Sequence, residues 1–280
     1  MEVEDKVQIT GIETHGEKLS FRIYNTDTSF VNGLRRMIMA EVPTIAIQLV
    51  RVHLNTSYLC DEYIAHRLGL IPLDSTKVYD FEDGDQTIFN IRVVNENERE
   101  SLNVTSNDLQ FVEGKKLFPV GYKSDNPIII TQLGPRQSLY VDCFATKGTG
   151  KFHAKWNPTC QCVFQTLADI QINETKLANL TGEQRRTFCE MCPQKVFEFQ
   201  EINGRITVDH PESCIFCQEC TVYSKDIGQR NFCTVTPKTD EFIFKVEGTG
   251  VYPAKSVVSY GFGEMINKFS YLKSELGKFK

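Results

Sequence analysis

The chain has 280 residues, enough for one large domain or two modest ones that each bury a core. Hydrophobic residues make up 41% and charged residues 24%, which excludes wholesale disorder, and the net charge of −5 argues against a broad basic face that binds nucleic acid. No apolar run approaches the roughly 20 residues that span a bilayer, and the acidic start Met1–Asp5 differs from the basic opening of a secretory signal.

The first 50 residues predict a strand hairpin followed by an amphipathic helix. Val7–Ile9 and Lys18–Tyr24 are expected to pair, because every second residue of the longer segment is apolar. A helix is expected to begin at the capping residues Asp27–Ser29 and to end before Pro43. Its apolar face carries Phe30, Leu34, Met37 and Ile38, and Arg35 and Arg36 lie off that face.

The middle of the chain is predicted to be rich in strands, with one short helix near Asp61–Leu68. The strand candidates, separated by turn residues, are Thr87–Val94, Ile128–Thr131, Ser138–Ala145 and Cys162–Gln165.

The C-terminal segment predicts a strand at Glu241–Val246 and then a long helix from about Pro253. The apolar stripe of that helix consists of Ala254, Val258, Phe262, Met265, Ile266, Phe269, Leu272 and Leu276. Periodicity alone favours packing of this stripe on the chain's own sheet. A stripe this long also suggests that part of it binds a second protein.

Six of the ten cysteines lie between residues 187 and 233. Cys214, Cys217 and Cys220 have the C-x2-C-x2-C spacing that places three thiolates around one small volume, as in ferredoxins. Cys192 precedes a proline, like the fourth ferredoxin ligand, and a hairpin formed by Val196–Gln200 and Arg205–Val208 would bring it back toward the loop. Cys189 misses the spacing that a second cluster requires.

These four cysteines leave three alternatives open. They could hold one iron–sulfur cluster (4Fe-4S or 3Fe-4S), a tetrahedral zinc ion, or no metal. Cys60, Cys143 and Cys162 are assigned to packing, and Cys160 and Cys233 are left unassigned.

Catalytic motifs are missing from the sequence, which has no G-x-G-x-x-G, Walker loop, G-x-S-x-G or H-E-x-x-H. The segment Lys147–Trp156 combines three lysines with His153 and the single tryptophan. It could contact a phosphate backbone or an acidic partner, or it could be a solvated loop anchored by Trp156.

Four segments together resemble the alpha-like subunits of multisubunit RNA polymerases. They are Phe30–Arg36 running into Ala40–Ile47, Asn55–Ser57 followed by Asp61–Leu73, Gly150–Pro158, and Phe242–Gly250. They span nearly the whole chain in the order of that family.

Three branches of the family share features with this sequence. It resembles the third-largest subunit of RNA polymerase II, the related subunit shared by polymerases I and III, and the archaeal counterpart of both. Ile64–Leu70 and Lys155–Thr159 favour polymerase II, whereas the cysteine insert favours the archaeal counterpart. Polymerase II relatives often carry a zinc loop after the second segment, but Asp74–Asn90 contains no cysteine.

The resemblance implies an α+β fold with a discontinuous dimerisation domain made of a sheet and two helices. That domain would comprise residues 1–50 and 236–280. A mostly β domain at 51–186 and a ferredoxin-like cysteine module at 187–235 would be inserted into it.

The resemblance also implies a function. The chain would be a non-catalytic assembly subunit that heterodimerises with a small alpha-like subunit and seats the two largest subunits during transcription. Other small polymerase subunits would be further partners, DNA would be contacted only indirectly, and no membrane would be involved. The chain would lie in the nucleus, or in the cytoplasm if archaeal.

Residue roles follow from the same resemblance. The dimer interface would be formed by Phe30, Leu34, Met37, Ile38, Val258, Phe262, Met265, Phe269 and Leu272. Contacts to the large subunits would come from Arg35, Arg36, Asp61, Glu62, His66 and Arg67. The metal, if bound, would be held by Cys192, Cys214, Cys217 and Cys220. An iron–sulfur electron-transfer or redox-sensing protein is the alternative function.

Overall fold

The computed structural model describes residues 6–82, 84–201 and 203–278, so the acidic start Met1–Asp5 lies outside the described residues. The described chain is a mixed α/β structure with several sheets, as the sequence predicts. Two compact units divide it: one consists of Met1–Ile12, Phe21–Val31 and Phe164–Phe244, and the other of Glu13–Ser20, Asn32–Val163 and Lys245–Lys280. None of the described helices is both long enough and apolar enough to cross a membrane. The predicted domain boundaries stay a prediction.

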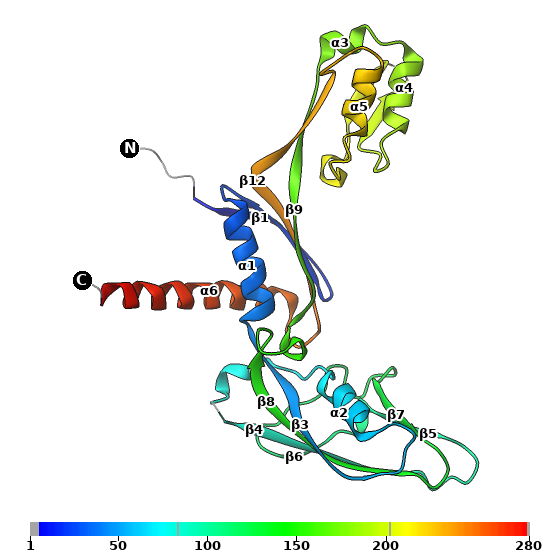
Figure 1. The fold of residues 1–280 in the computed structure, drawn as a ribbon, viewed down its shortest axis with the longest axis vertical. Helices are drawn as coiled ribbons and strands as arrows, with labels where there is room; N and C mark the ends of the chain where they lie inside the picture. The colour runs from blue at the N-terminus through cyan, green and yellow to red at the C-terminus, as the bar shows by residue number, and fades with distance from the viewer. Residues whose placement is uncertain (1–5, 83, 202, 279–280) are drawn as a thin grey trace. The chain divides into compact units, whose positions relative to one another are not determined.

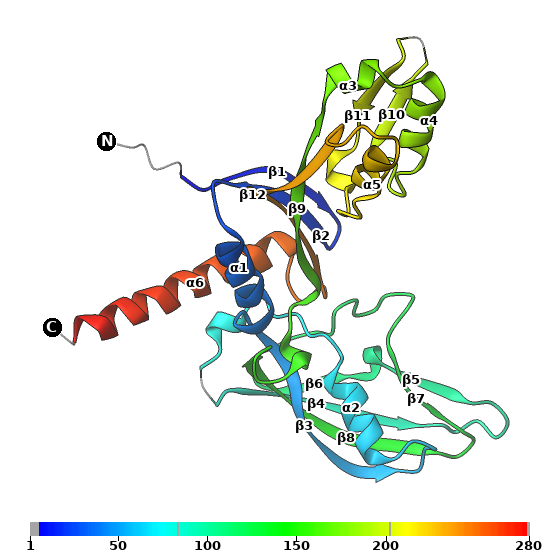
Figure 2. The ribbon, with the colours of Figure 1, turned by 45° about the horizontal axis from the view of Figure 1, so that its top comes forward.

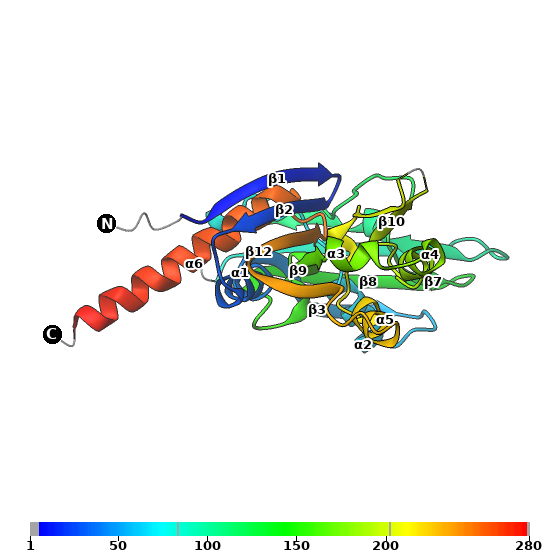
Figure 3. The same ribbon diagram turned by 90° about the horizontal axis from the view of Figure 1, so that it is seen from above.

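Four strands form a sheet in the order β1-β2-β12-β9 (Figure 3). They are β1 (Gln8–His15), β2 (Lys18–Tyr24), β12 (Cys233–Gly248) and β9 (Thr159–Ile172). Phe21 stacks on Phe244 with ring centroids 5.2 Å apart, and Phe164 meets Phe242 edge-on at 5.8 Å. The predicted hairpin and last strand are confirmed, and β9 and β12 are longer than the alternation predicted.

A small module between residues 173 and 232 is built around the ring of Phe188. It contains α3 (Glu174–Ala178), α4 (Gly182–Glu190), β10 (Phe197–Gln200), β11 (Arg205–Val208) and α5 (Glu219–Asp226) (Figure 2). Phe188 is 1% exposed, and its ring centroid lies 4.7 Å from that of Phe197 and 5.1 Å from that of Phe232. β10 pairs antiparallel with β11, which confirms the predicted hairpin. The module therefore has an apolar core of its own.

In the other unit, a second four-stranded sheet has the order β3-β8-β4-β6. Its strands are β3 (Pro43–Asn55), β8 (Ser138–Thr149), β4 (Gln86–Val94) and β6 (Gln110–Glu113). The register of β3 against β8 shifts between Ile47 and Leu49 and again between Val52 and Leu54. Gln48 and His53 are the extra residues at these two bulges, which bend the strand.

The short helix α2 (Asp61–Gly69) is confirmed close to its predicted bounds. Ile64 and Leu68 are buried, and the helix packs against β3 and against β7 (Ile129–Leu133). β7 pairs antiparallel with β5 (Leu102–Thr105) in a two-stranded sheet.

Helices α1 (Thr28–Ala40) and α6 (Ala254–Gly277) also match their predicted positions (Figure 1). At the start of α1, the backbone N–H of Phe30 donates to the carboxylate of Asp27 at 2.7 Å, which satisfies one free donor of the helix.

The two helices cross where α6 carries a glycine. A Cβ atom on Gly261 would lie 2.5 Å from Cγ1 of Ile38, so only glycine permits this approach. Beyond the crossing, the ammonium group of Lys268 lies 2.6 Å from the carboxylate of Glu41, and α6 extends past α1 (Figure 1).

Two of the three lysines of the segment Lys147–Trp156 bond to the chain's own backbone, whereas the side chain of Lys151 is 70% exposed and its ammonium group lies 3.7 Å from the carboxylate of Glu41. The ammonium groups of Lys147 and Lys155 donate to the carbonyl oxygens of Phe81 and Ile47 at 3.2 and 2.9 Å. Burial lowers the pKa of Lys155. Trp156 is 2% exposed. These contacts support a loop anchored by Trp156, with Lys151 and His153 on its exposed part; a contact of this loop with a phosphate backbone or an acidic partner stays a prediction.

Candidate functional site

The apolar stripe of α6 divides into a buried and an exposed half. Val258 and Met265 are each 8% exposed, and Phe262 is half-buried. In contrast, Phe269 is 60% and Leu272 is 49% exposed. Ile266 and Leu276 are also exposed. The first half of the helix therefore packs on its own chain, and the second half presents an apolar face.

The stripe of α1 lies deeper than that of α6. Leu34 and Ile38 are fully buried, whereas Phe30 and Met37 are half-buried. Among the predicted interface residues, those of α1 contribute mainly to the core, and Phe269 and Leu272 contribute most of the exposed apolar surface.

The two arginines of α1 differ in their freedom to bind a partner. Arg35 is half-buried, and its guanidinium donates to the side-chain oxygen of Asn32 at 3.0 and 3.2 Å. Arg36 is exposed. Arg36 is therefore the better placed of the two for a contact with another subunit.

The predicted contact residues of α2 also differ in whether they are exposed or already bonded within the chain. Asp61 accepts a hydrogen bond from Asn55 at 2.7 Å, and Glu62 and His66 are exposed. Nε of Arg67 donates to the carbonyl oxygen of Ile130 at 2.8 Å, and its Nη2 donates to that of Ile129. Two guanidinium nitrogens of Arg67 therefore link α2 to β7 within the same chain, a structural role that the sequence analysis did not predict.

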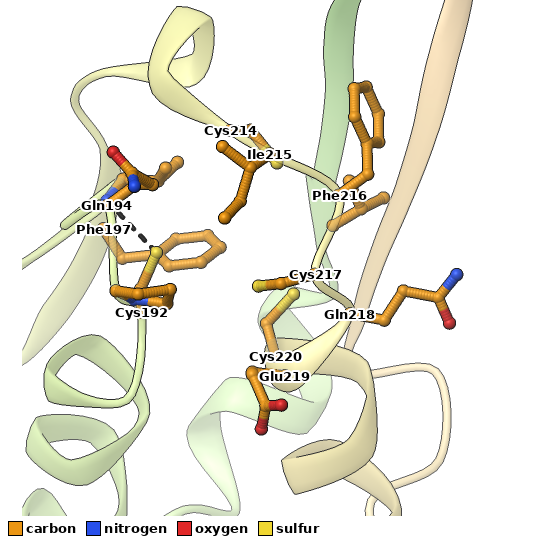
Figure 4. A pocket seen from close by; sticks show the side chains of 13 residues that line it. Cys192, Gln194, Phe197, Cys214, Ile215, Phe216, Cys217, Gln218, Glu219 and Cys220 are labelled. Carbon is orange, nitrogen blue, oxygen red and sulfur yellow. Dashed lines mark hydrogen bonds between the residues drawn. The ribbon is translucent and has the colours of Figure 1, made fainter.

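The four cysteines of the predicted metal site line one small pocket of the module (Figure 4). Cys192 follows α4, Cys214 and Cys217 lie in the loop before α5, and Cys220 lies in the first turn of α5. The sulfur of Cys192 accepts a hydrogen bond from the backbone N–H of Val196 at 3.4 Å. The topology thus brings together the cysteines that the spacing predicted.

A fifth cysteine, Cys233, takes part in this cluster. Cys233 is buried at the start of β12, and its thiol hydrogen-bonds with Cys220. That bond lowers the pKa of Cys220 and raises the pKa of Cys233, because the thiolate of Cys220 accepts from the thiol of Cys233. Burial raises the pKa of Cys214. Sequence spacing gave no signal for Cys233, since it follows Cys220 by 13 residues and belongs to no motif.

The pocket suits a metal ion in its donor chemistry but not in its present geometry. Thiolates are ligands of zinc and of iron–sulfur clusters. The cavity measures about 20 Å³, which is room for about one water molecule. A four-iron cluster therefore does not fit without movement of the loop. Within residues 6–82, 84–201 and 203–278, no three His, Cys, Asp or Glu side chains are positioned to hold one metal ion. The ligand set stays a prediction.

The three cysteines assigned to packing differ in burial. Cys143 and Cys162 are buried, and burial raises the pKa of each thiol to about 12, as expected for inert packing residues. Cys60 is exposed. The packing assignment of Cys60 is wrong, because this residue precedes α2 on the surface instead of facing the core.

Comparison with known proteins gives matches along almost the whole chain. Residues 20–269 match the family described as the RNA polymerase Rpb3/Rpb11 dimerisation domain. The chain is 36% identical to a conjugation stage-specific protein of Tetrahymena thermophila, over 97% of this chain and 94% of that protein. It is 32% identical to DNA-directed RNA polymerase II subunit rpb3 of Dictyostelium discoideum, over 95% and 94%. It is 33% identical to DNA-directed RNA polymerases II, IV and V subunit 3 of Arabidopsis thaliana, over 94% and 87%.

Proposed function

Because the chain belongs to the RNA polymerase Rpb3/Rpb11 dimerisation family, we propose that it is a non-catalytic assembly subunit of a DNA-directed RNA polymerase. Two of the relatives are named as polymerase II subunits and come from eukaryotes, which supports a polymerase II type and a nuclear location. None of the three relatives is named for electron transfer, so the redox alternative gains no support.

The exposed half of α6 is the observation that carries this proposal. Phe269 and Leu272 expose 60% and 49% of their surface on a helix whose first half is held by the chain's own core. Apolar side chains on a fixed helix suit a partner helix of similar character. We therefore assign this face to the small alpha-like subunit of the proposed heterodimer.

The proposed heterodimer would in turn seat the two largest subunits. Arg36, Glu62 and His66 are exposed and suit contacts across such a surface. The family architecture, a discontinuous dimerisation domain with an inserted mostly β domain and a ferredoxin-like module, is proposed with it. The aromatic core around Phe188 supports the last of these divisions, because it gives the module an independent source of stability.

A metal in the cysteine module is a separate proposal. Cys192, Cys214, Cys217 and Cys220 would hold a zinc ion or an iron–sulfur cluster after the loop before α5 rearranges to make room for it. The bound metal would crosslink the loop before α5 to the segment that follows α4, and its role would be structural. Cys214→Ser should then lose the metal and lower the melting temperature of the module, whereas Cys143→Ser should retain the metal. Normal melting of the Cys214 variant would contradict this role.

A tagged pull-down from native extract tests the function. We expect two large polymerase subunits and a small alpha-like protein to be recovered with the chain, with their identities fixed by mass. Iron and zinc measured in the same anaerobic eluate would distinguish a cluster from a single ion. Recovery of iron together with redox enzymes and without polymerase subunits would overturn the assembly role.

A further inference from the structure

One charged side chain lies within the exposed apolar face of α6. Lys273 follows Ile266 by seven residues and Phe269 by four, and residues at these spacings share one side of a helix. Ile266 and Phe269 are 64% and 60% exposed, and Lys273 is exposed beside them. A partner that covers this face therefore covers an ammonium group together with the apolar side chains.

Lys273 differs from the other lysines in this half of α6, because it has no counter-charge. Lys268 lies 2.6 Å from Glu41, and Lys278 lies 2.6 Å from Glu275. Glu275 is two residues beyond Lys273, which places it about 200° around the helix. Among the residues that the structure describes, no carboxylate forms an ion pair with Lys273.

Burial of this ammonium group against a partner requires a charge on that partner. An ammonium group taken out of water without a counter-charge is strongly unfavourable, whereas one that meets a carboxylate keeps its charge and forms a directed contact. A single lysine in an apolar helix seam also selects between partners, because a partner without the matching charge leaves it unpaired. The surface that covers this face therefore has to combine apolar side chains with a carboxylate opposite Lys273.

A second copy of this chain does not offer that carboxylate from its own α6. The acidic residues of this helix, Ala254–Gly277, are Glu264 and Glu275. The hydroxyl of Tyr79 donates to Glu264 at 3.2 Å, and Lys278 pairs with Glu275, so both carboxylates are already bonded. In a two-fold pair of α6 helices, each Lys273 would meet an apolar stripe that carries another lysine.

We propose that Lys273 makes the α6 face selective for a partner whose apolar helix carries an aspartate or glutamate opposite it. The same lysine opposes pairing of α6 with a second copy of the chain. The proposal rests on the proposed function, because it specifies the chemistry of the small alpha-like subunit at this face. It adds a charge requirement that the apolar stripe alone does not contain.

A zero-length crosslink tests for the counter-charge. A water-soluble carbodiimide joins an ammonium group to a carboxylate where the two are in contact, and mass spectrometry locates the resulting amide. In the purified heterodimer we expect Lys273 to be joined to an Asp or Glu of the small alpha-like subunit. A heterodimer in which Lys273 forms no such amide would overturn the proposal. Failure to form any heterodimer would instead overturn the proposed function, and this proposal with it.

Substitutions measure the contribution of the charge to binding. Lys273→Glu should weaken the heterodimer about 100-fold, because it places two carboxylates together, and Lys273→Leu about tenfold, because it leaves one carboxylate unpaired. Asn267→Glu is the matched control. Asn267 is exposed and lies about 200° around the helix from Phe269, so this variant should bind within about threefold of the parent. All three variants should melt like the parent chain, since both positions are exposed.

The chain without its partner provides a second readout. In sedimentation, Lys273→Leu should self-associate at a concentration about tenfold lower than the parent chain, because the stripe no longer carries a charge. Added salt should weaken the parent heterodimer more than the Lys273→Leu heterodimer. Unchanged heterodimer affinity of Lys273→Glu, or equal self-association of Lys273→Leu and the parent, would overturn the proposal.

Discussion

Replacement of Phe269 by aspartate should weaken heterodimer formation without unfolding the chain. The side chain is 60% exposed, so the free chain loses little when the ring is removed. Complete burial of a large apolar side chain contributes about 1.5–3 kcal/mol, so burial of the exposed part on a partner contributes up to about 2 kcal/mol. A carboxylate in the apolar seam adds an unfavourable desolvation of at least about 1 kcal/mol. Together these effects should weaken the heterodimer about 100-fold or more.

The assay is the dissociation constant between the purified chain and the small alpha-like subunit, measured by titration calorimetry. Arg35→Ala is the matched control, because Arg35 lies off the apolar stripe and is hydrogen-bonded to Asn32 within its own helix. We expect this variant to bind within about threefold of the unmodified chain, as for other partly exposed charges. Melting curves of both variants should match that of the parent chain.

Two results would refute the reasoning. Equal loss of binding for Phe269→Asp and Arg35→Ala would show that the apolar stripe contributes no more to heterodimer binding than a charged residue outside it. Unchanged binding of Phe269→Asp would remove the second half of α6 from the interface altogether.

Three further predictions concern stability. Gly261→Ala should lower the melting temperature, because its Cβ would overlap Ile38 at the helix crossing and such overpacking costs about 1–3 kcal/mol. Gly263→Ala is the control, because its Cβ would meet no other atom of the described chain. This second variant should raise the melting temperature through a gain in helix propensity of about 0.5–1 kcal/mol. Phe188→Ala should destabilise the module by about 3–5 kcal/mol. Limited proteolysis should then cleave rapidly between residues 173 and 232, whereas pairing with the small subunit should persist. A module that resists proteolysis in this variant would show that its core does not depend on the Phe188 ring. Lys268 lowers the pKa of Glu41, so their contact stabilises the fold above the unfolded pKa and is lost as the pH falls through the lower folded value. The melting temperatures of Glu41→Gln and the parent should therefore differ at pH 7 and converge in acid, once Glu41 is protonated in the folded chain. A difference that does not depend on pH would contradict this origin.

The sequence predicted elements whose signal is local and periodic. Alternation at Leu19, Phe21 and Ile23 identified β2, and the long stripe of α6 fixed that helix almost to the residue. Strand β3 was missed, because Pro43 was interpreted only as the end of α1 although it also begins the next strand. Its bulges interrupt the alternation that marks a strand.

Among the candidate functional residues too, local patterns were predicted and contacts between distant segments were not. Cysteine spacing correctly gathered Cys192 with the loop before α5, since a motif and a hairpin place these residues by local geometry. The contacts of Arg67 with β7 and of Cys233 with Cys220 could not be predicted. They join segments 62–63 and 13 residues apart, and no pattern in the sequence specifies which chain segments meet there.

The two bulges of β3 determine where this strand tolerates a change in length. Elsewhere in a paired strand, removal of one residue turns every following side chain to the opposite face. At Gln48 or His53 the strand already holds one residue more than its partner β8, so a deletion there restores ordinary pairing and keeps the flanking apolar residues on their faces. Gaps between β3 and shorter counterparts in related chains should therefore fall at these two positions, because a gap elsewhere in the paired strand would turn the following side chains to the opposite face.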